Sequence, residues 1–403
     1  MAFRKRGLLT LLCCSMLLCS CSGGSTDSSP LTPDQIFSGG SKNNDTAVMM
    51  DISSQRLVSN IRIGWNLGNT LECCISDLDG NGITDVMPVD GDAVSETLWG
   101  SPMATEKLFK ALADSGVNAV RLPVTWRDHI GRTGKIEESW LNRVTQVAEY
   151  AYDCGMYVIL TMYHDGAADT DHGAWIRTAA TDFETVSSQY ENLWRQISEH
   201  FSQYNERILF ESMNEVGFGT LPRNEAMTTL NRLNQIFVDT VRSTGGNNPE
   251  RHLIIAGYMA DIEQTCTENF AMPDDPAERC IVSVHYYYPK TFCQLGIVNE
   301  WGSEAEQNWM EENIALLEST FVDNGIPVII TEYGTSGSDL PSRIFFCEKL
   351  TKLCRDAGIA TFLWDGGEWL DRTSYSWSSS ELIRALTRAS SGIDYTPEKI
   401  TAD

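Results

Sequence analysis

Positive charge is scarce in this sequence. Its 403 residues include 30 lysines and arginines against 55 aspartates and glutamates, which gives a formal net charge of −25. The basic cluster Arg4, Lys5 and Arg6 has no counterpart later in the chain, whereas a nucleic-acid-binding surface needs a basic stripe to neutralise phosphates. Nucleic acids are therefore excluded as expected partners.

Long apolar runs are lacking except at the N-terminus, where an apolar stretch over residues 7–20 follows the basic cluster. The stretch is too short for a mature membrane-spanning helix and is typical of a cleaved export signal, predicted here as residues 1–20. Its end, Leu18-Cys19-Ser20-Cys21, looks like a bacterial lipobox, in which Cys21 becomes the lipidated first residue of the mature protein. A simple secretory signal is the alternative.

Residues 21–47 have few large apolar side chains and many Ser, Gly, Thr, Asn and Asp. Such a composition cannot build a core and predicts a flexible tether. Together, signal and tether predict an exported lipoprotein of the bacterial cell envelope or cell surface that contacts a membrane only through its lipid anchor. Without lipidation the protein would be secreted.

Metal-binding cysteine motifs are lacking as well: no CxxC pair and no His/Cys cluster with ligand spacing occurs, so zinc is not expected. Eight of the 12 cysteines lie beyond residue 21, and an exported protein can pair them in disulfides. Eight cysteines allow 105 connectivities, among which the sequence does not choose. Cys347 and Cys354 are excluded as a pair, since seven residues along one helix separate them by about 10 Å.

Apolar residues, in contrast, make up 42% of the chain and are sufficient for a large core. Short β-branched runs alternate with longer stretches of helical period, the pattern of a parallel sheet surrounded by helices. The runs are residues 61–65, 117–124, 156–162, 207–213, 252–256, 281–287, 327–332 and 359–364.

Eight such units predict a single (β/α)8 TIM barrel of the α/β class over residues 48–395. The alternative, a doubly wound open sheet, would normally carry a glycine-rich phosphate turn after its first strand. Residues 64–68 do not form such a turn.

Polar side chains stand at the ends of these runs, and in such a barrel the chemistry takes place at the C-terminal ends of the strands. Asn214 and Glu215 follow the fourth run, and Glu332 ends the seventh. Further strand-end candidates are Arg121 in the second run, Tyr163-His164-Asp165 after the third, His285 and Tyr287 in the sixth and Trp364 in the eighth.

This set of residue types is what hydrolysis of a glycosidic bond requires. One carboxylic acid protonates the leaving oxygen, a carboxylate attacks the sugar carbon, and flat aromatic faces hold the sugar ring. Four Asn-Glu pairs occur in the chain, but only Asn214-Glu215 directly follows an apolar strand. For Glu332, the alternative is a strand-end carboxylate paired with a structural arginine.

The chain carries, in order, the segments GWNLGNT (64–70), WGSP (99–102), VRLPVTW (120–126), FESMNE (210–215), VHYY (284–287), ITEYG (330–334) and LW (363–364). In these segments it resembles glycoside hydrolase family 5, particularly the bacterial endo-β-1,4-glucanases, or cellulases. The resemblance implies hydrolysis with retention and no metal in the chemistry.

By this resemblance Glu215 is the acid/base and Glu332 the nucleophile. The residues that would bind substrate or support the glutamates are Arg121, Asn214, His285, Tyr287 and Trp364, to which we add Asn69 and His164 as candidates.

Two positions depart from the family pattern. Tyr163 stands where the third strand usually ends in histidine, and His164 follows one place later, on the opposite face or in the loop. This change concerns the substrate-binding wall and leaves the preferred sugar open. Val216 follows Asn214-Glu215 where proline is usual, which should alter only the loop after the catalytic acid.

The segment after the first strand has the spacing of a calcium loop. Its oxygen donors are Asp77, Asp79, Asn81, the Ile83 carbonyl and Asp85, with Gly82 at the sixth position. The twelfth position is Pro88 rather than glutamate. A structural calcium ion and a plain acidic turn are both open, and neither would take part in the chemistry.

The two glutamates must be kept in different protonation states. We expect Arg121 and Tyr287 to keep Glu332 ionised and a less charged setting to raise the pKa of Glu215. Retention requires the two carboxyl groups to lie about 5 Å apart. Trp364 is expected to form the floor beneath the sugar ring, or else to cap the barrel interior.

The sequence therefore predicts a retaining, endo-acting hydrolase of a β-1,4-glucan such as cellulose, monomeric and without a catalytic cofactor. Xyloglucan, mixed-linkage glucan and mannan are alternative substrates for the same chemistry. The alternative of a different class is a non-catalytic, surface-anchored glycan-binding protein. Such a protein typically lacks one of the two carboxylates, and Glu215 and Glu332 are both present.

Overall fold

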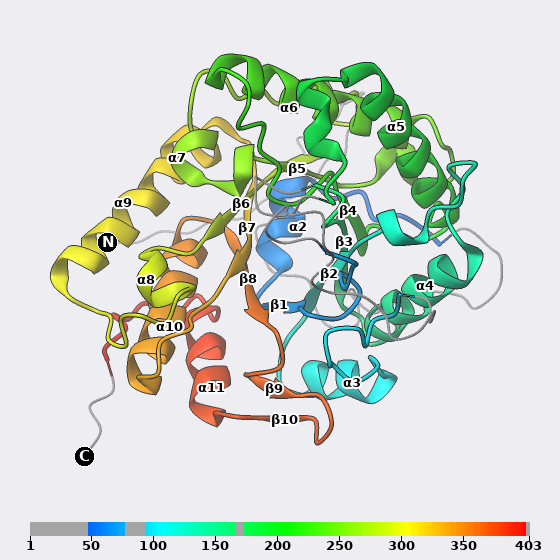
Figure 1. Ribbon diagram of the computed structural model, residues 1–403. Helices are drawn as coiled ribbons and strands as arrows, with labels where there is room; N and C mark the ends of the chain where they lie inside the picture. Colours follow the sequence, from blue (N-terminus) through cyan, green and yellow to red (C-terminus); the bar gives the residue numbers. More distant parts are fainter. Residues whose placement is uncertain (1–46, 77–93, 167–172, 400–403) are drawn as a thin grey trace, which may run out of the picture.

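The computed structural model describes residues 47–76, 94–166 and 173–399. Within them, eight parallel strands close into a barrel in which each strand pairs with the next along the chain and β8 pairs with β1 (Figure 1). The strands are β1 (Gly64–Leu67), β2 (Ala119–Val124), β3 (Tyr157–Met162), β4 (Ile208–Glu211), β5 (Leu253–Ala256), β6 (Cys280–Tyr286), β7 (Val328–Tyr333) and β8 (Ala360–Asp365). The predicted barrel is confirmed, and the doubly wound alternative is wrong.

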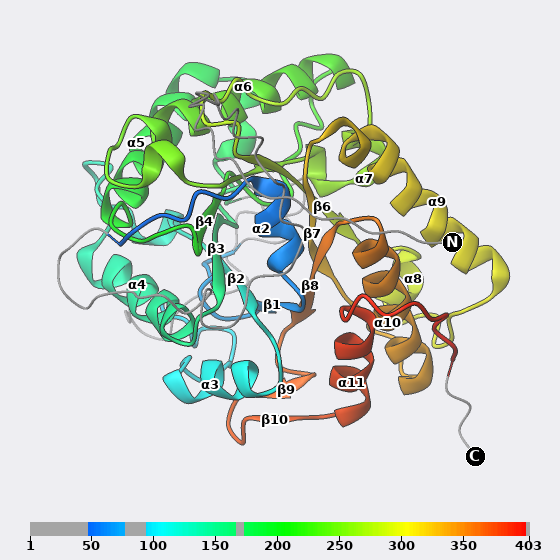
Figure 2. The same cartoon turned by 180° about the vertical axis from the view of Figure 1, so that it is seen from behind.

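Helices surround the barrel, most of them in an outer layer and the first, α2, over the middle of the ring of strands, as the opposite views in Figures 1 and 2 show. They are α2 (Ser54–Asn60), α3 (Glu106–Asp114), α4 (Glu138–Asp153), α5 (Phe183–His200), α6 (Arg223–Arg242), α7 (Ile262–Thr265), α8 (Lys290–Cys293), α9 (Glu304–Thr320), α10 (Leu340–Asp356) and α11 (Ser380–Ala389). Short 3₁₀ helices are η1 (Arg127–His129), η2 (Ile176–Ala180), η3 (Asn248–Glu250), η4 (Tyr258–Ala260) and η5 (Val322–Asn324), and a small antiparallel pair is formed by β9 (Leu370–Asp371) and β10 (Ser376–Trp377). Among the described residues, no helix has the length and apolar character needed to cross a bilayer.

The first strand begins later than its apolar run predicts. Ile61 caps α2, and the backbone N–H groups of Arg62 and Ile63 both donate to Oδ1 of Asn118. These hydrogen bonds replace strand pairing, so β1 starts at Gly64. A Cβ at Gly64 would lie 2.4 Å from the Phe362 ring, which explains why glycine stands at this close approach.

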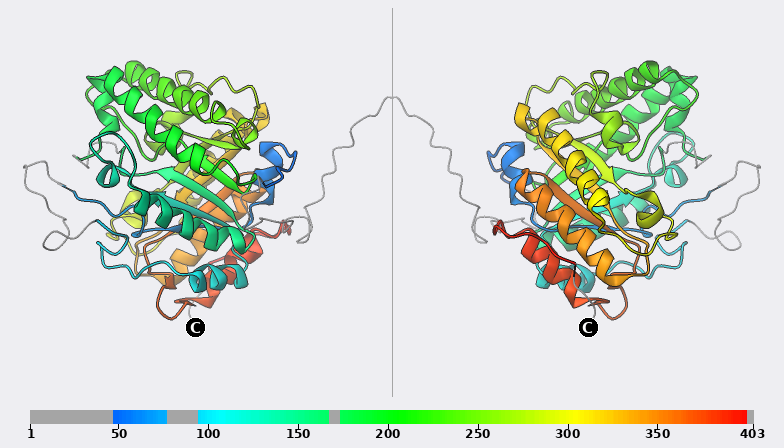
Figure 3. Two further views of the ribbon diagram at one scale, coloured as in Figure 1. Left: turned by 90° about the vertical axis from the view of Figure 1, so that its right-hand side faces the viewer. Right: turned by 90° about the vertical axis from the view of Figure 1, so that its left-hand side faces the viewer.

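The interior of the barrel changes from apolar to polar along the strands. Because side chains alternate between the two faces of a strand, residues two apart point the same way. Leu209, Ile281 and Ile329 belong to a buried apolar cluster inside the barrel, together with Leu57 and Val58 of α2. Helix α2 thus closes the N-terminal end of the barrel, and Figure 3 shows it at one end of the molecule.

The next inward positions toward the C-terminal ends are polar. Arg121 follows Ala119 by two residues, and Glu211 follows Leu209 in the same way. On β6, Ser283 and His285 continue the face that Ile281 begins. The alternation therefore gathers the polar groups at one end of the barrel, opposite α2.

Strand β7 contains an irregularity at the point where it enters this polar end. Val284 of β6 pairs with Ile330, but the next residue, His285, pairs with Glu332, so β7 has one extra residue. A bulge of this kind re-aims a side chain. Both Thr331 and Glu332 reach interior partners as a result, since the Thr331 hydroxyl lies 2.6 Å from that of Ser283 and Glu332 contacts Arg121.

Cysteines in the described part of the chain are unpaired: all eight beyond residue 21 are free thiols. Cys347 and Cys354 lie on α10, as predicted. The predicted signal and lipidation site, residues 21–46 of the predicted tether and the calcium-loop candidates Asp77 to Asp85 lie outside the described residues.

Candidate active site

Arg121 lies at the centre of the polar end of the barrel and is completely buried. Its Nη1 donates to Glu332 Oε1 at 2.5 Å and to Asn66 Oδ1 at 3.1 Å, Nη2 donates to Asn214 Oδ1 at 2.9 Å, and Nε donates to Glu211 Oε2 at 2.5 Å. Burial alone would lower the pKa of the guanidinium, but the carboxylates of Glu211 and Glu332 outweigh it and raise that pKa. Arg121 is therefore a fixed positive charge.

Glu215 and Glu332 lie on either side of His285. Nδ1 of His285 is 2.7 Å from Glu215 Oε1 and 3.6 Å from Glu332 Oε2, and the Tyr287 hydroxyl donates to Glu332 Oε2 at 3.1 Å. One oxygen of each glutamate and a His285 nitrogen lie within 4.8 Å of one another. This spacing matches the roughly 5 Å of retaining glycosidases and not the roughly 6.5–9.5 Å of inverting ones.

The charge of His285 decides the protonation state of Glu215. Burial raises the pKa of Glu215, but the hydrogen bond from His285 and its charge outweigh burial, so the pKa lies below its usual value. Burial lowers the pKa of His285, yet Glu332 and Glu215 together raise it above its usual value. The predicted rise in the Glu215 pKa is wrong for the ligand-free protein, because the hydrogen bond and charge of His285 lower that pKa more than burial raises it.

Trp364 and Tyr163 form one wall of a cavity of about 280 Å³ that also contains Glu215, Tyr287 and Glu332. The Trp364 indole is half-buried and stacks on the Tyr163 ring, with ring centroids 5.9 Å apart and planes inclined by 20°. Trp364 therefore faces the cavity, the geometry expected of a floor residue rather than of a cap over the barrel interior.

Two predicted substrate-binding residues do not line this cavity. The ring of His164 makes edge contacts with Tyr163 and Trp99, with centroids 4.8 Å and 5.6 Å away. Its charge contributes to the low pKa of Glu215. Asn69 has a left-handed backbone, φ 55°, and its N–H donates to the buried Glu72. The structure brings together Glu215, Glu332, Arg121, Asn214, His285, Tyr287 and Trp364, and leaves Asn69 and His164 at the margin.

Glu211 is the residue that sequence reasoning missed. Its carboxylate is buried between Arg121 and Ser283, whose hydroxyl donates to Glu211 Oε1 at 2.6 Å. Burial raises its pKa, but the Arg121 charge and these hydrogen bonds outweigh burial and lower it. The signal was present in the sequence, because strand alternation from Leu209 points Glu211 inward.

Within the described residues, one group of three side chains could offer ligand atoms to a metal ion: Glu215, His285 and Glu332. The same atoms already contact one another, and Arg121 places a positive charge 2.5 Å from Glu332 Oε1. The carboxylate oxygens that could bind a metal ion are thus already paired with Arg121, His285 and Tyr287.

Comparison with known proteins places this site in a family context. Residues 80–368 match the family model described as Cellulase (glycosyl hydrolase family 5). The chain is 31% identical to Endoglucanase A of Paenibacillus barcinonensis, and the match covers 82% of this chain and 87% of that protein. It is 34% identical to Cellulase/esterase CelE of Acetivibrio thermocellus over 84% of its length, but it spans only 41% of that longer protein.

Among solved structures, the chain is similar to PbGH5A of Prevotella bryantii B14, a mutant of which is in complex with a xyloglucan tetradecasaccharide. The TM-score is 0.73 at 34% identity, and the match covers 85% of this chain and 100% of that one.

Proposed function

The chain belongs to glycosyl hydrolase family 5, and from this premise we propose that it is an endo-acting β-1,4-glucanase that works with retention of configuration. The observation that carries the proposal is the pair Glu215 and Glu332, with one oxygen of each within 4.8 Å of the other. That gap leaves no room for a water molecule between a carboxylate and the sugar, so Glu332 must itself attack.

Glu332 is suited to act as the nucleophile. Arg121 donates to one of its oxygens and Tyr287 to the other, which keeps the carboxylate oriented. Its attack on the anomeric carbon would form a covalent glycosyl-enzyme, and water would then release the sugar with the original configuration.

Glu215 would supply the proton to the leaving oxygen. In the ligand-free state the raised pKa of His285, 2.7 Å away, and the lowered pKa of Glu215 favour the proton on His285. A bound sugar chain displaces water and adds to the burial that already raises the pKa of Glu215, which favours transfer of the proton from His285 to Glu215. In the second step Glu215, as carboxylate, would take a proton from the attacking water.

The remaining side chains would hold the sugar ring. Trp364 offers a flat apolar face within the cavity, and Tyr163 fixes that face from behind by stacking. Asn214, whose Oδ1 is occupied by Arg121, keeps its amide N–H groups for the sugar 2-hydroxyl. Family 5 endoglucanases need no catalytic cofactor, and a structural calcium at residues 77–85 stays a separate proposal.

A β-1,4-linked glucan main chain is the proposed substrate. Xyloglucan is the first alternative, since a similar structure binds it, and mixed-linkage glucan or mannan follow. A non-catalytic glycan-binding role is less well supported, because both glutamates and their charge partners are in place. We also propose that the protein is a monomer, exported and anchored by a lipid on Cys21.

The test of the proposed function compares three proteins. Reducing-sugar release from a panel of glucans and mannans should be robust for the parent and several orders of magnitude slower for Glu215→Gln and Glu332→Gln, with melting unchanged. On an aryl glycoside with a good leaving group, Glu215→Gln should recover part of its activity and Glu332→Gln none, because only the nucleophile is still needed. Near-native activity of either variant on the polymer would contradict the assignment.

A further inference from the structure

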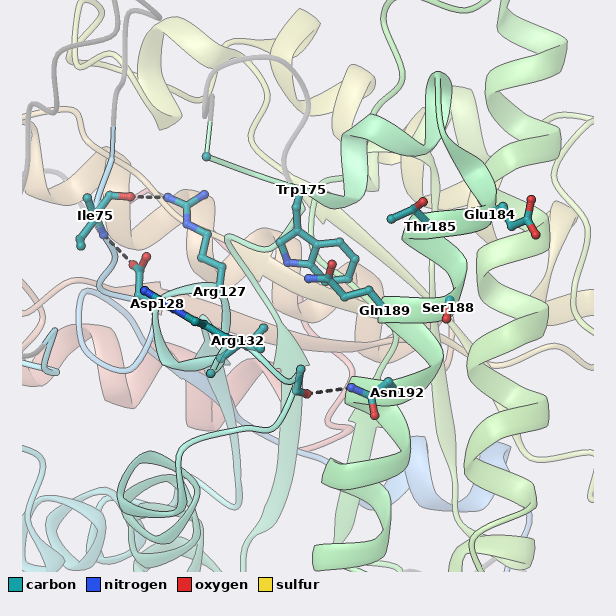
Figure 4. Close-up of a pocket in the computed structure, with 14 residues that line it drawn as sticks. Ile75, Arg127, Asp128, Arg132, Trp175, Glu184, Thr185, Ser188, Gln189 and Asn192 are labelled. Atoms are coloured by element: carbon teal, nitrogen blue, oxygen red, sulfur yellow. Dashed lines mark hydrogen bonds between the residues drawn. The ribbon is translucent and has the colours of Figure 1, made fainter.

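A second cavity lies beside helix α5, outside the barrel interior, and has a volume of about 1180 Å³. One wall is the segment from Arg127 to Gly134 after β2, and the other is a face of α5. Figure 4 shows Trp175 between these walls, with Arg127 and Asp128 on one side and Thr185 and Ser188 on the other. None of these residues belongs to the site of Glu215 and Glu332.

Trp175 is held in place by the buried carboxylate of Asp165. The indole Nε1 donates to Asp165 Oδ1 at 2.7 Å, and the other oxygen accepts the Trp126 backbone N–H at 2.7 Å. The indole is half-buried and lines the cavity. An immobilised aromatic ring offers a flat apolar surface at little entropic cost.

The α5 wall is a stripe of polar side chains. Thr185, Ser188, Gln189 and Asn192 follow the spacing of one helix face, whereas Tyr190 on the opposite face is buried. Asn192 donates to the Gly134 carbonyl at 2.7 Å and ties the two walls together. The side chains of Ser188 and Gln189 make no hydrogen bond within the described part of the chain, so their donors and acceptors are available to a ligand.

Charge in the cavity is balanced. The lining contains two arginines, Arg127 and Arg132, and two carboxylates, Asp128 beside them on the same wall and Glu184 on the α5 side. Arg127 is occupied by the carbonyls of His164 and Ile75, at 2.8 Å and 2.6 Å. A strongly charged ligand therefore finds no excess of the opposite charge, and a neutral ligand fits best.

We propose that this cavity is a second binding site for a neutral glycan chain, in which a sugar ring stacks on Trp175 and its hydroxyls hydrogen-bond to Gln189 and Ser188. This inference rests on the proposed glucanase function. Strand β3 leads to both sites, since Tyr163 lines the catalytic cavity and Asp165, two residues later, holds Trp175. The second site would keep a long polysaccharide on the enzyme between cleavage events.

The test separates polymer binding from turnover. Gln189→Ala combined with Ser188→Ala removes the available polar groups and places a good helix former at both positions, so the fold should be kept. In a Glu332→Gln background, which cannot cut the polymer, gel retardation by soluble β-glucan or xyloglucan should weaken about 3- to 10-fold. Trp175→Ala should weaken it at least as much, and Ser187→Ala, on the same helix but outside the cavity, should not change it.

With Glu332 intact, kcat/KM on a short aryl cello-oligosaccharide should be the same for the Gln189/Ser188 variant and the parent. In the retardation experiment, the second site would be overturned if the Glu332→Gln protein were retarded equally with and without the Gln189/Ser188 or Trp175 substitutions. It would also be overturned if the Glu332→Gln protein were not retarded at all. Failure of the proposed function has a different signature, namely no hydrolysis of short or long glucans by the protein with Glu332 intact.

Discussion

At the level of single residues, Arg121 both stabilises the fold and positions the proposed nucleophile Glu332. It is buried among Glu211, Glu332, Asn66 and Asn214, and it makes hydrogen bonds to all four. Removing one partner of a buried ion pair typically costs about 3–5 kcal/mol, because the other charge is left unpaired. Loss of activity in an Arg121 variant would therefore report on folding as much as on catalysis.

His285 should determine the upper pH limit of activity. Its raised pKa lets the His285–Glu215 pair keep its proton to a pH above the usual histidine value. In His285→Gln the proton must reside on Glu215 alone, whose carboxyl loses it at lower pH. We expect the basic limb of the kcat/KM profile to move to lower pH in His285→Gln, and an unmoved limb would mean that another group supplies the proton.

Trp364 can be tested for a role in turnover. Its indole is half-buried and faces the cavity, so Trp364→Ala should lower kcat strongly while leaving the melting temperature close to native. A tryptophan that fills the barrel interior would instead lose about 3–5 kcal/mol of stability on truncation. Thermal melting measured beside turnover distinguishes the two outcomes.

At the level of elements, α2 closes the N-terminal end of the barrel, far from the catalytic residues, and we expect it to affect stability but not catalysis. Leu57 is fully buried against the N-terminal ends of the strands, so Leu57→Ala should lower the free energy of unfolding by about 2–5 kcal/mol. Gln55→Ala, on the exposed side of the same helix, is the matched control. Equilibrium unfolding should separate the two variants, and kcat/KM well below the melting temperature should not.

The strands could be predicted from the sequence because apolar runs and strand-end polar groups are local signals. The start of β1 could not, since Asn118, distant in sequence, takes the N–H groups of Arg62 and Ile63. The β7 bulge depends on register with β6 and β8 and leaves no local mark. The direction of the Glu215 pKa could not be predicted for a similar reason. Burial does raise that pKa, as expected, but the opposing charge of His285 comes close to Glu215 only in the folded barrel.

At the level of the whole molecule, the predicted lipid anchor is open to a direct test. Residues 22–45 contain little that could hold the protein to a membrane without a lipid. We therefore expect Cys21→Ala to move the protein from the membrane fraction to the soluble fraction, with its specific activity unchanged. Membrane association that persists in Cys21→Ala would contradict the lipobox interpretation.

The described chain begins at the closed, N-terminal end of the barrel, opposite the catalytic residues. The Ala47 N–H donates to the Gln203 carbonyl at 2.8 Å, and the Met50 N–H donates to Glu206 at 2.9 Å, both just before β4 begins. The chain thus joins the folded body at the face that α2 plugs. If residues 21–47 form the predicted tether, the catalytic end of the barrel would point away from the point of attachment, and an incoming polysaccharide would reach that end first.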